Sequence, residues 1–79
     1  MIRNYDFSKA SKIYIAMDDH NKDLVYVTLT EDGDIIEHGN MHSETRMFES
    51  YRFFEAIFNS GAKIIFKKHS NELIDKLKA

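Results

Sequence analysis

The sequence predicts one α/β (α+β) domain with the element order strand-strand-strand-helix-strand-helix. Three observations predict this fold class. Apolar and polar residues alternate in the first half of the chain, as they do in half-buried strands. Short polar turns, one of them containing the Asp-Gly pair at 32–33, separate the alternating segments as in β-hairpins. A longer segment in the second half carries apolar residues at helical spacing instead.

The composition is typical of a soluble globular domain. The 79 residues are 43% hydrophobic and 30% charged, with a net charge of −2 and no cysteine. The lack of cysteine excludes disulfides and zinc sites with cysteine ligands, and the net charge argues against general nucleic-acid binding. No apolar run reaches the ~18–20 residues of a membrane span, and the N-terminus lacks the apolar core of a signal peptide. We expect a cytoplasmic protein with no membrane association, in the host cytoplasm if it is phage-encoded.

Residues 1–11 are predicted to form an N-terminal arm, and residues 12–79 the domain itself. We expect Tyr5 and Phe7 to hold the arm against an edge of the sheet. Residues 12–17 and 24–30 alternate and are predicted strands, joined by the polar turn DDHNKD. Tyr14 and Tyr26 are expected to share one sheet face, opposite the face that carries the aliphatic side chains of these strands.

Residues 35–41 follow the Asp-Gly turn and are predicted to form a third strand, and residues 42–60 a long helix that ends at Gly61. At 100° per residue, one apolar stripe is expected to face the sheet, formed by Met47, Tyr51, Phe54 and Phe58. Phe53 falls on the polar side of the predicted helix. We therefore expect the Phe53 ring to project away from the core.

Residues 62–66 are an apolar run that predicts a fourth strand, and residues 71–78 a short helix. The inward side of this helix is expected to carry Leu73, Ile74 and Leu77. Two hairpins make the first three strands antiparallel, and a right-handed crossover through the long helix places the fourth strand parallel to the first. The predicted result is a mixed four-stranded sheet in the order 3-2-1-4.

The segment IAMDDH at 15–20, with the hairpin residues Glu31-Asp32-Gly33, resembles the opening of ribonuclease H-like domains. More narrowly, it resembles the opening of DEDD-type transposases. The resemblance covers about residues 12–75 and implies a ribonuclease H-like topology. It also implies that Asp18 matches a ligand of the catalytic divalent metal in those families. Where they carry a second carboxylate, after the fourth strand, this chain has Lys67 or Lys68, so the resemblance implies a shortened, non-catalytic version.

The carboxylates of the first turn have two interpretations. Asp18, together with Asp23 and Asp34, would form a weak Mg²⁺ site if the three side chains converged. Asp18 and Asp19 are neighbours, so in a strand their side chains point to opposite faces and cannot share one ion. A solvated turn is the favoured interpretation. No cofactor is expected, and a bound Mg²⁺ is expected only if the alternative interpretation, a metal site that includes Asp18, is correct.

Two surface features remain as candidates for binding. Lys63, Lys67 and Lys68 form a small basic patch, which predicts either a solvated face or a contact with an acidic group or phosphate. Tyr14, Tyr26 and Phe53 are expected to be exposed, and exposed aromatic side chains on a small domain indicate a partner interface. The alternative is that the arm or the second helix covers them.

We therefore expect a small non-enzymatic protein-binding module that masks a partner's surface. The partner is either another protein or a second copy, which would make a homodimer. Its size suggests an accessory or inhibitor protein of phage or mobile-element type, such as an anti-defence or anti-CRISPR protein. The alternative from another class is a metal-dependent nuclease or transposase-derived domain with Asp18 as ligand. Nucleic-acid binding through the lysines is the weakest alternative.

Overall fold

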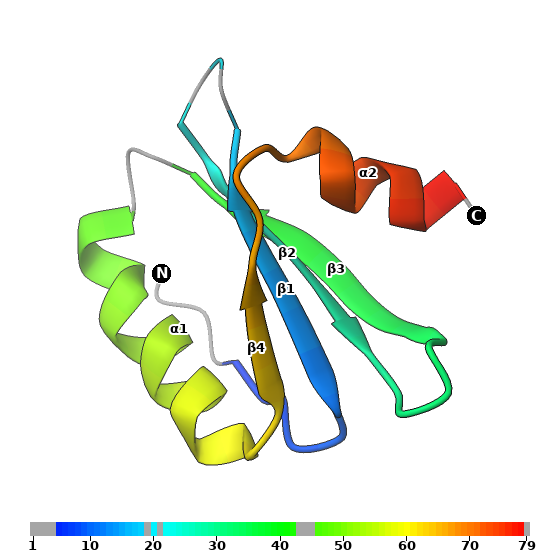
Figure 1. Ribbon diagram of the computed structural model, residues 1–79. Helices are drawn as coiled ribbons and strands as arrows, with labels where there is room; N and C mark the ends of the chain where they lie inside the picture. Colours follow the sequence, from blue (N-terminus) through cyan, green and yellow to red (C-terminus); the bar gives the residue numbers. More distant parts are fainter. Residues whose placement is uncertain (1–4, 19, 21, 43–45, 79) are drawn as a thin grey trace.

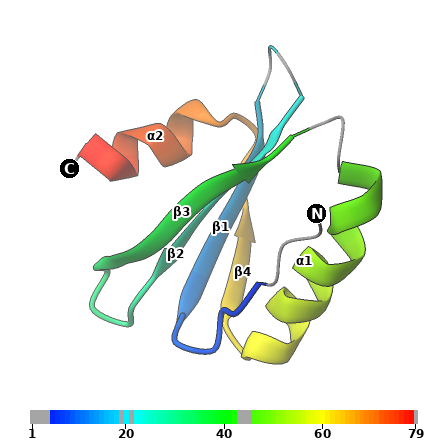
Figure 2. The same ribbon diagram turned by 180° about the vertical axis from the view of Figure 1, so that it is seen from behind.

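The computed structural model of the protein describes residues 5–18, 20, 22–42 and 46–78, and shows one sheet with a helix on each face (Figures 1 and 2). The four-stranded sheet has the order β3-β2-β1-β4, with β1 antiparallel to β2 and parallel to β4. The predicted fold class and strand order are confirmed. The elements are β1 (Lys12–Met17), β2 (Leu24–Leu29), β3 (Ile35–Met41), α1 (Arg46–Ser60), β4 (Lys63–Phe66) and α2 (Asn71–Lys78).

Glycine supplies the two backbone conformations that set the element boundaries. Gly33 closes the β2–β3 hairpin at φ 93°, and Gly61 follows α1 at φ 74°. Side chains with a Cβ adopt these left-handed conformations only at a cost. A bulge beside Thr28 and Leu29 then shifts the register between β2 and β3. Among the described residues, no helix is long and apolar enough to cross a membrane.

The core has two parts, one on each face of the sheet. On the first face, Ile13 and Ile15 of β1 and Tyr26 of β2 pack with Phe53 and Ile57 of α1. The second face is smaller, and its buried cluster consists of Ala16, Val27, Leu29 and Leu73. Leu73 is the α2 residue of this cluster, so α1 and α2 cover opposite faces. The side chains of Ile74 and Leu77 lie outside the described residues.

The N-terminal arm is part of the first core. Phe7 is buried, and its ring centroid lies 5.6 Å from that of Tyr26 and 5.7 Å from that of Phe53. Tyr5 stacks edge-on against Phe53 at 5.2 Å. The prediction that these aromatics hold the arm at the sheet edge is wrong. The rings of Tyr5 and Phe7 lie between α1 and the sheet, because both contact Phe53 of α1 and Tyr26 of β2.

The register of β1 and β2 corrects the expected tyrosine face. Ile15 is paired with Tyr26, and Tyr14 with Val27. Paired residues on neighbouring strands share a face, so Tyr26 lies on the α1 face and Tyr14 on the α2 face. The prediction that both tyrosines share one face is wrong, because a shift of one residue in pairing moves a side chain to the other face. Gly39 of β3 lies opposite Tyr26, and a Cβ there would be 2.9 Å from the Tyr26 hydroxyl oxygen.

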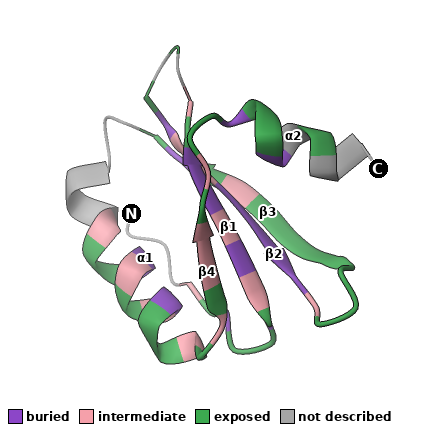
Figure 3. Cartoon of the chain, viewed as in Figure 1, coloured by how far each residue is buried: buried purple, intermediate pink, exposed green. Residues whose placement is uncertain are grey.

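Helix α1 is rotated about its axis relative to the prediction. Phe53 has 0% of its surface exposed, whereas Tyr51 and Phe58 are 72% and 73% exposed. Figure 3 shows the buried positions of α1 on its sheet-facing side and exposed positions opposite. The stripe predicted to face the core therefore points largely outward. Only Phe54 of that stripe is partly buried against the core, and the side chain of Met47 lies outside the described residues.

Candidate functional site

The three aromatic residues predicted to contact a partner occupy different environments. Tyr26 and Phe53 each have 0% exposed surface, so the expectation that they are exposed is wrong. Their ring centroids lie 5.2 Å apart in the centre of the first core. Tyr14 is half-buried beside the smaller core on the other face. Of the three, only Tyr14 lies where a partner of the folded domain could touch it.

The exposed aromatic side chains among the described residues lie on α1, and one more, Phe66, lies on β4. Tyr51 and Phe58 are nearly three-quarters exposed, and Phe54 lies between them with its ring centroid 6.5 Å from that of Phe58. These residues are spaced i, i+3 and i+7, which places them along one side of a helix. We call this set, Tyr51, Phe54 and Phe58, the aromatic stripe. The sequence pattern identifies the stripe correctly but assigns it to the core.

Charged groups border the aromatic stripe. The Tyr51 hydroxyl is hydrogen-bonded to Glu55, and this bond together with the negative charge of Glu55 raises the pKa of Tyr51 above its usual value. Arg52 and Glu55 are both exposed on the adjoining side of α1. An apolar centre with a polar border is the usual anatomy of a protein–protein interface.

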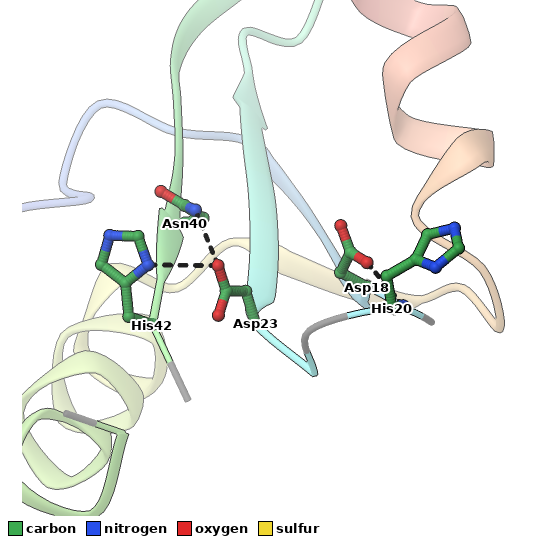
Figure 4. A network of polar contacts seen from close by, with 5 residues as sticks. All are labelled: Asp18, His20, Asp23, Asn40 and His42. Carbon is green, nitrogen blue, oxygen red and sulfur yellow. Dashed lines mark hydrogen bonds and ion pairs between the residues drawn. The ribbon is translucent and has the colours of Figure 1, made fainter. Parts of the chain in front are cut away.

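A polar network lies at the end of the sheet where the β1–β2 turn meets β3 (Figure 4). Asp23 is only 5% exposed, and its Oδ2 accepts a hydrogen bond from Asn40 Nδ2 at 3.2 Å and lies 3.1 Å from His42 Nδ1. The Asp23 carbonyl also accepts a bond from the Asp18 N–H at 2.7 Å. A buried carboxylate requires such partners because burial removes its water. Asp23 therefore joins the turn to the end of β3.

We expect Asp23→Ala to lower the free energy of unfolding by about 1–3 kcal/mol, because it removes the acceptor shared by Asn40 and His42. Urea unfolding followed by circular dichroism measures the difference. The matched control is His42→Ala, which removes an exposed partner and should cost less than about 1 kcal/mol. Equal stability of Asp23→Ala and the unaltered protein would contradict a structural role for the network.

Asp18 has a local role in the turn. Its carboxylate accepts a hydrogen bond from the His20 N–H at 2.8 Å, and its carbonyl accepts one from the Lys22 N–H at 3.0 Å. Asp34 lies in the hairpin at the opposite end of β2, where it is bonded to Thr30. The three carboxylates of the predicted Mg²⁺ set therefore do not converge, and no group of three His, Asp or Glu side chains within the described part of the chain is arranged to hold a metal. Asp19 lies outside the described residues.

The predicted basic patch lies along and just after β4. Lys67 follows the strand, and its N–H donates to the Ile15 carbonyl at 2.8 Å. Its Nζ lies 5.9 Å from the centre of the Tyr14 ring, close enough for a cation–π contact. Lys63 is in register with Lys12 of β1, which brings two like charges side by side. Lys68 is exposed after the strand.

A cavity of about 390 Å³ lies between the arm and α1. Its size is within the range of small-molecule sites. The lining mixes aromatic, charged and small polar side chains, namely Tyr5, Asp6, Phe7, Ser8, Arg52, Glu55, Ala56, Asn59 and Ser60. Hydrogen bonds from Ser8 lower the pKa of the exposed Asp6 carboxyl, which is part of this lining. Both signs of charge line the cavity, so its electrostatics select no one class of ligand.

The surface features of the described residues that suit binding are thus the aromatic stripe of α1 and the lysines of β4, both positioned by the mixed sheet. The polar network around Asp23 is accounted for by its structural bonds. No protein-family model, no curated protein and no solved structure matches this chain.

Proposed function

We propose that the chain is a small non-enzymatic protein-binding module that masks part of a partner's surface with the aromatic stripe of α1. One observation carries the proposal: Tyr51 and Phe58 are more than 70% exposed on one side of a helix, with Phe54 between them. Large aromatic side chains are enriched among the residues that dominate binding energy, and clustered ones mark interfaces.

The apolar area of the stripe indicates how much free energy it can contribute to binding. Covering two largely exposed rings removes on the order of 300 Å² of apolar surface from water. At about 25 cal/mol per Å², this contributes about 7 kcal/mol before the cost of association. That cost is itself about 4–15 kcal/mol. The stripe about offsets this cost, so it would form the centre of an interface whose remaining contacts supply the net affinity. The charged border residues Arg52 and Glu55 would lie in its rim.

We infer further that the sheet is a shortened ribonuclease H-like topology. The parallel β1–β4 pair and the position of Asp18 directly after β1 support this inference. Lys67 and Lys68 come directly after β4, where the families that the sequence resembles carry a second carboxylate. The position of these lysines favours binding over metal-dependent cleavage, because a cation there repels a divalent metal. A role as an accessory or inhibitor protein of phage or mobile-element type, in the anti-defence class, fits a small domain that acts by masking.

We expect Phe58→Ser and Tyr51→Ser each to weaken partner binding by about tenfold or more, since buried aromatic anchors typically contribute over about 2 kcal/mol. Affinity capture from host lysate with mass spectrometry identifies the partner, and titration of the purified partner gives the dissociation constants. Light scattering on the protein alone tests a second copy as partner. The matched control is Glu31→Ser, an exposed change in the β2–β3 turn that should leave binding unchanged.

Circular dichroism should show the same unfolding midpoint for all three variants within a few degrees, because these side chains are exposed. The proposal is wrong if both stripe variants bind the captured partner as tightly as the unaltered protein. It is also wrong if the protein is monomeric and captures no partner above background.

A further inference from the structure

The outer side of β4 is a sheet edge with its own hydrogen-bonding groups. β4 is the last strand in the sheet order and pairs with β1. The Lys63 and Lys67 N–H groups donate inward, to Ser11 and Ile15 of the β1 side at 3.0 and 2.8 Å. Because successive residues of a strand direct their peptide groups to opposite sides, the N–H and C=O of Ile64 and Phe66 point outward. Such outward groups are a template for another strand.

The side chains of β4 differ between its two faces. Ile64 and Phe66 are in register with Ile13 and Ile15, so they lie on the α1 face. Phe66 is 68% exposed there, beside the outward peptide groups. Lys63 and Lys67 project to the other face, where Lys67 reaches Tyr14. A strand placed beside β4 would therefore have Lys63 and Lys67 next to one of its faces, with Ile65 between them, and the apolar side chains of Ile64 and Phe66 next to the other.

We propose that this edge binds an extended acidic segment of another protein, which adds to the sheet as a further strand beside β4. Backbone groups of Ile64 and Phe66 would bond to the added strand. Asp or Glu side chains on one face of that strand would pair with Lys63 and Lys67, and apolar side chains on its other face would cover Phe66. The expected partner sequence therefore alternates acidic and apolar residues over about five to seven positions.

The strand edge, the two lysines and Phe66 each restrict the class of ligand that can bind. Lysines alone attract any polyanion, including a single-stranded nucleic acid. A nucleic acid, however, has no strand backbone to pair with the outward groups of Ile64 and Phe66. An apolar peptide would pair with the edge but leave Lys63 and Lys67 without opposite charges. The acidic, alternating strand is the ligand that matches the edge, the lysines and Phe66 together.

The other edge of the sheet does not present the same combination. β3 is longer, but the bulge opposite Thr28 and Leu29 interrupts its register. Its exposed side chains include Glu37 and His38, so the charge along it is mixed. The proposed site on β4 is also independent of the aromatic stripe, since it uses other side chains and the backbone. A negative result for the β4 edge would therefore leave the proposal for the aromatic stripe unchanged, and a negative result for the stripe would leave the proposal for the β4 edge unchanged.

The experiment uses a synthetic peptide of about nine alternating glutamate and valine residues, long enough to span β4. Its control is a peptide of the same composition in block order, which keeps the charge but cannot place acids on one face. Fluorescence anisotropy gives the affinities, and amide NMR shows where each peptide binds. We expect the alternating peptide to bind with a dissociation constant of order 0.1–1 mM, to shift the Ile64 and Phe66 amides, and to slow their hydrogen exchange.

The lysines are tested by Lys63→Glu with Lys67→Glu, which should weaken binding of the alternating peptide at least about tenfold. Lys63→Gln with Lys67→Gln is the milder version, to be used if the reversed charges prevent folding. The control is Lys9→Glu, which changes an exposed lysine of the arm. The proposal is overturned if both peptides bind equally, or if the shifts fall on other elements. It is also overturned if oligo-dT binds and the peptide does not, or if nothing binds. That last result would mean that the lysines only protect the edge from other strands.

Discussion

Phe53→Ala is expected to lower the free energy of unfolding by about 3–5 kcal/mol, the usual cost of emptying a fully buried aromatic site. The Phe53 ring is fully buried and lies 5.2 to 5.7 Å from the rings of Tyr5, Phe7 and Tyr26. A domain of this length has about 4–12 kcal/mol of total stability. The substitution should therefore remove a large share of that stability and shift the urea midpoint clearly downward.

The matched control is Phe58→Ala, the same chemical change on the same helix at an exposed position. It should alter the free energy of unfolding by less than about 0.5 kcal/mol. Urea unfolding followed by far-UV circular dichroism measures both variants. The opposite order, with Phe58→Ala the more destabilising, would mean that α1 packs on the sheet through the face predicted from its sequence.

Leu73→Ala is expected to cost about 2–5 kcal/mol, because the Leu73 side chain of α2 is fully buried in the smaller core. It packs with Ala16, Val27 and Leu29 on the face that α1 does not reach. Since α2 is only eight residues long, it has little helical stability without this contact. Loss of the contact should release α2 and leave Val27 and Leu29 uncovered.

Thermal unfolding followed by circular dichroism and amide exchange by NMR measure this effect. The control is Asp75→Ala, an exposed substitution on α2 that should be nearly neutral. If Leu73→Ala left both the unfolding midpoint and the protection of the α2 amides unchanged, α2 would not be held by the second core.

The arrangement of the strands follows from local features of the sequence. Period-two alternation marks residues 12–17 and 24–29, and the Asp-Gly pair at 32–33 fixes the hairpin that joins the second strand to the third. The long helix then forces the crossover that makes β4 parallel to β1. Each of these inferences depends on residues close together in the chain, which is why the sheet order could be predicted.

The faces of the elements depend on residues far apart in the chain. The sides taken by Tyr14 and Tyr26 are set by the pairing of Ile15 with Tyr26, and a shift of one residue would exchange them. The orientation of α1 depends on the arm, because Tyr5 and Phe7 provide the rings against which Phe53 packs. A helical pattern with aromatic residues on two sides cannot indicate which side the arm will cover.

The sequence does not predict the polar network, for the same reason. Asp23 bonds to Asn40 and His42, which lie 17 and 19 positions along the chain, and only the register of β2 and β3 brings them together. The sequence does contain one signal, a carboxylate directly before an apolar strand. By contrast, the positions of Lys63 and Lys67 on one face of β4 follow from simple alternation.

The most direct test of the proposed function is site-specific photo-crosslinking at position 58. Phe58 would be replaced by the photoreactive benzoyl-phenylalanine, and the same residue placed at the exposed position Glu31 serves as control. We expect irradiation in host lysate to give one discrete cross-linked product at position 58, suppressed by excess unaltered protein and absent at position 31. Equal or no cross-linking at the two positions would contradict a binding role for the aromatic stripe.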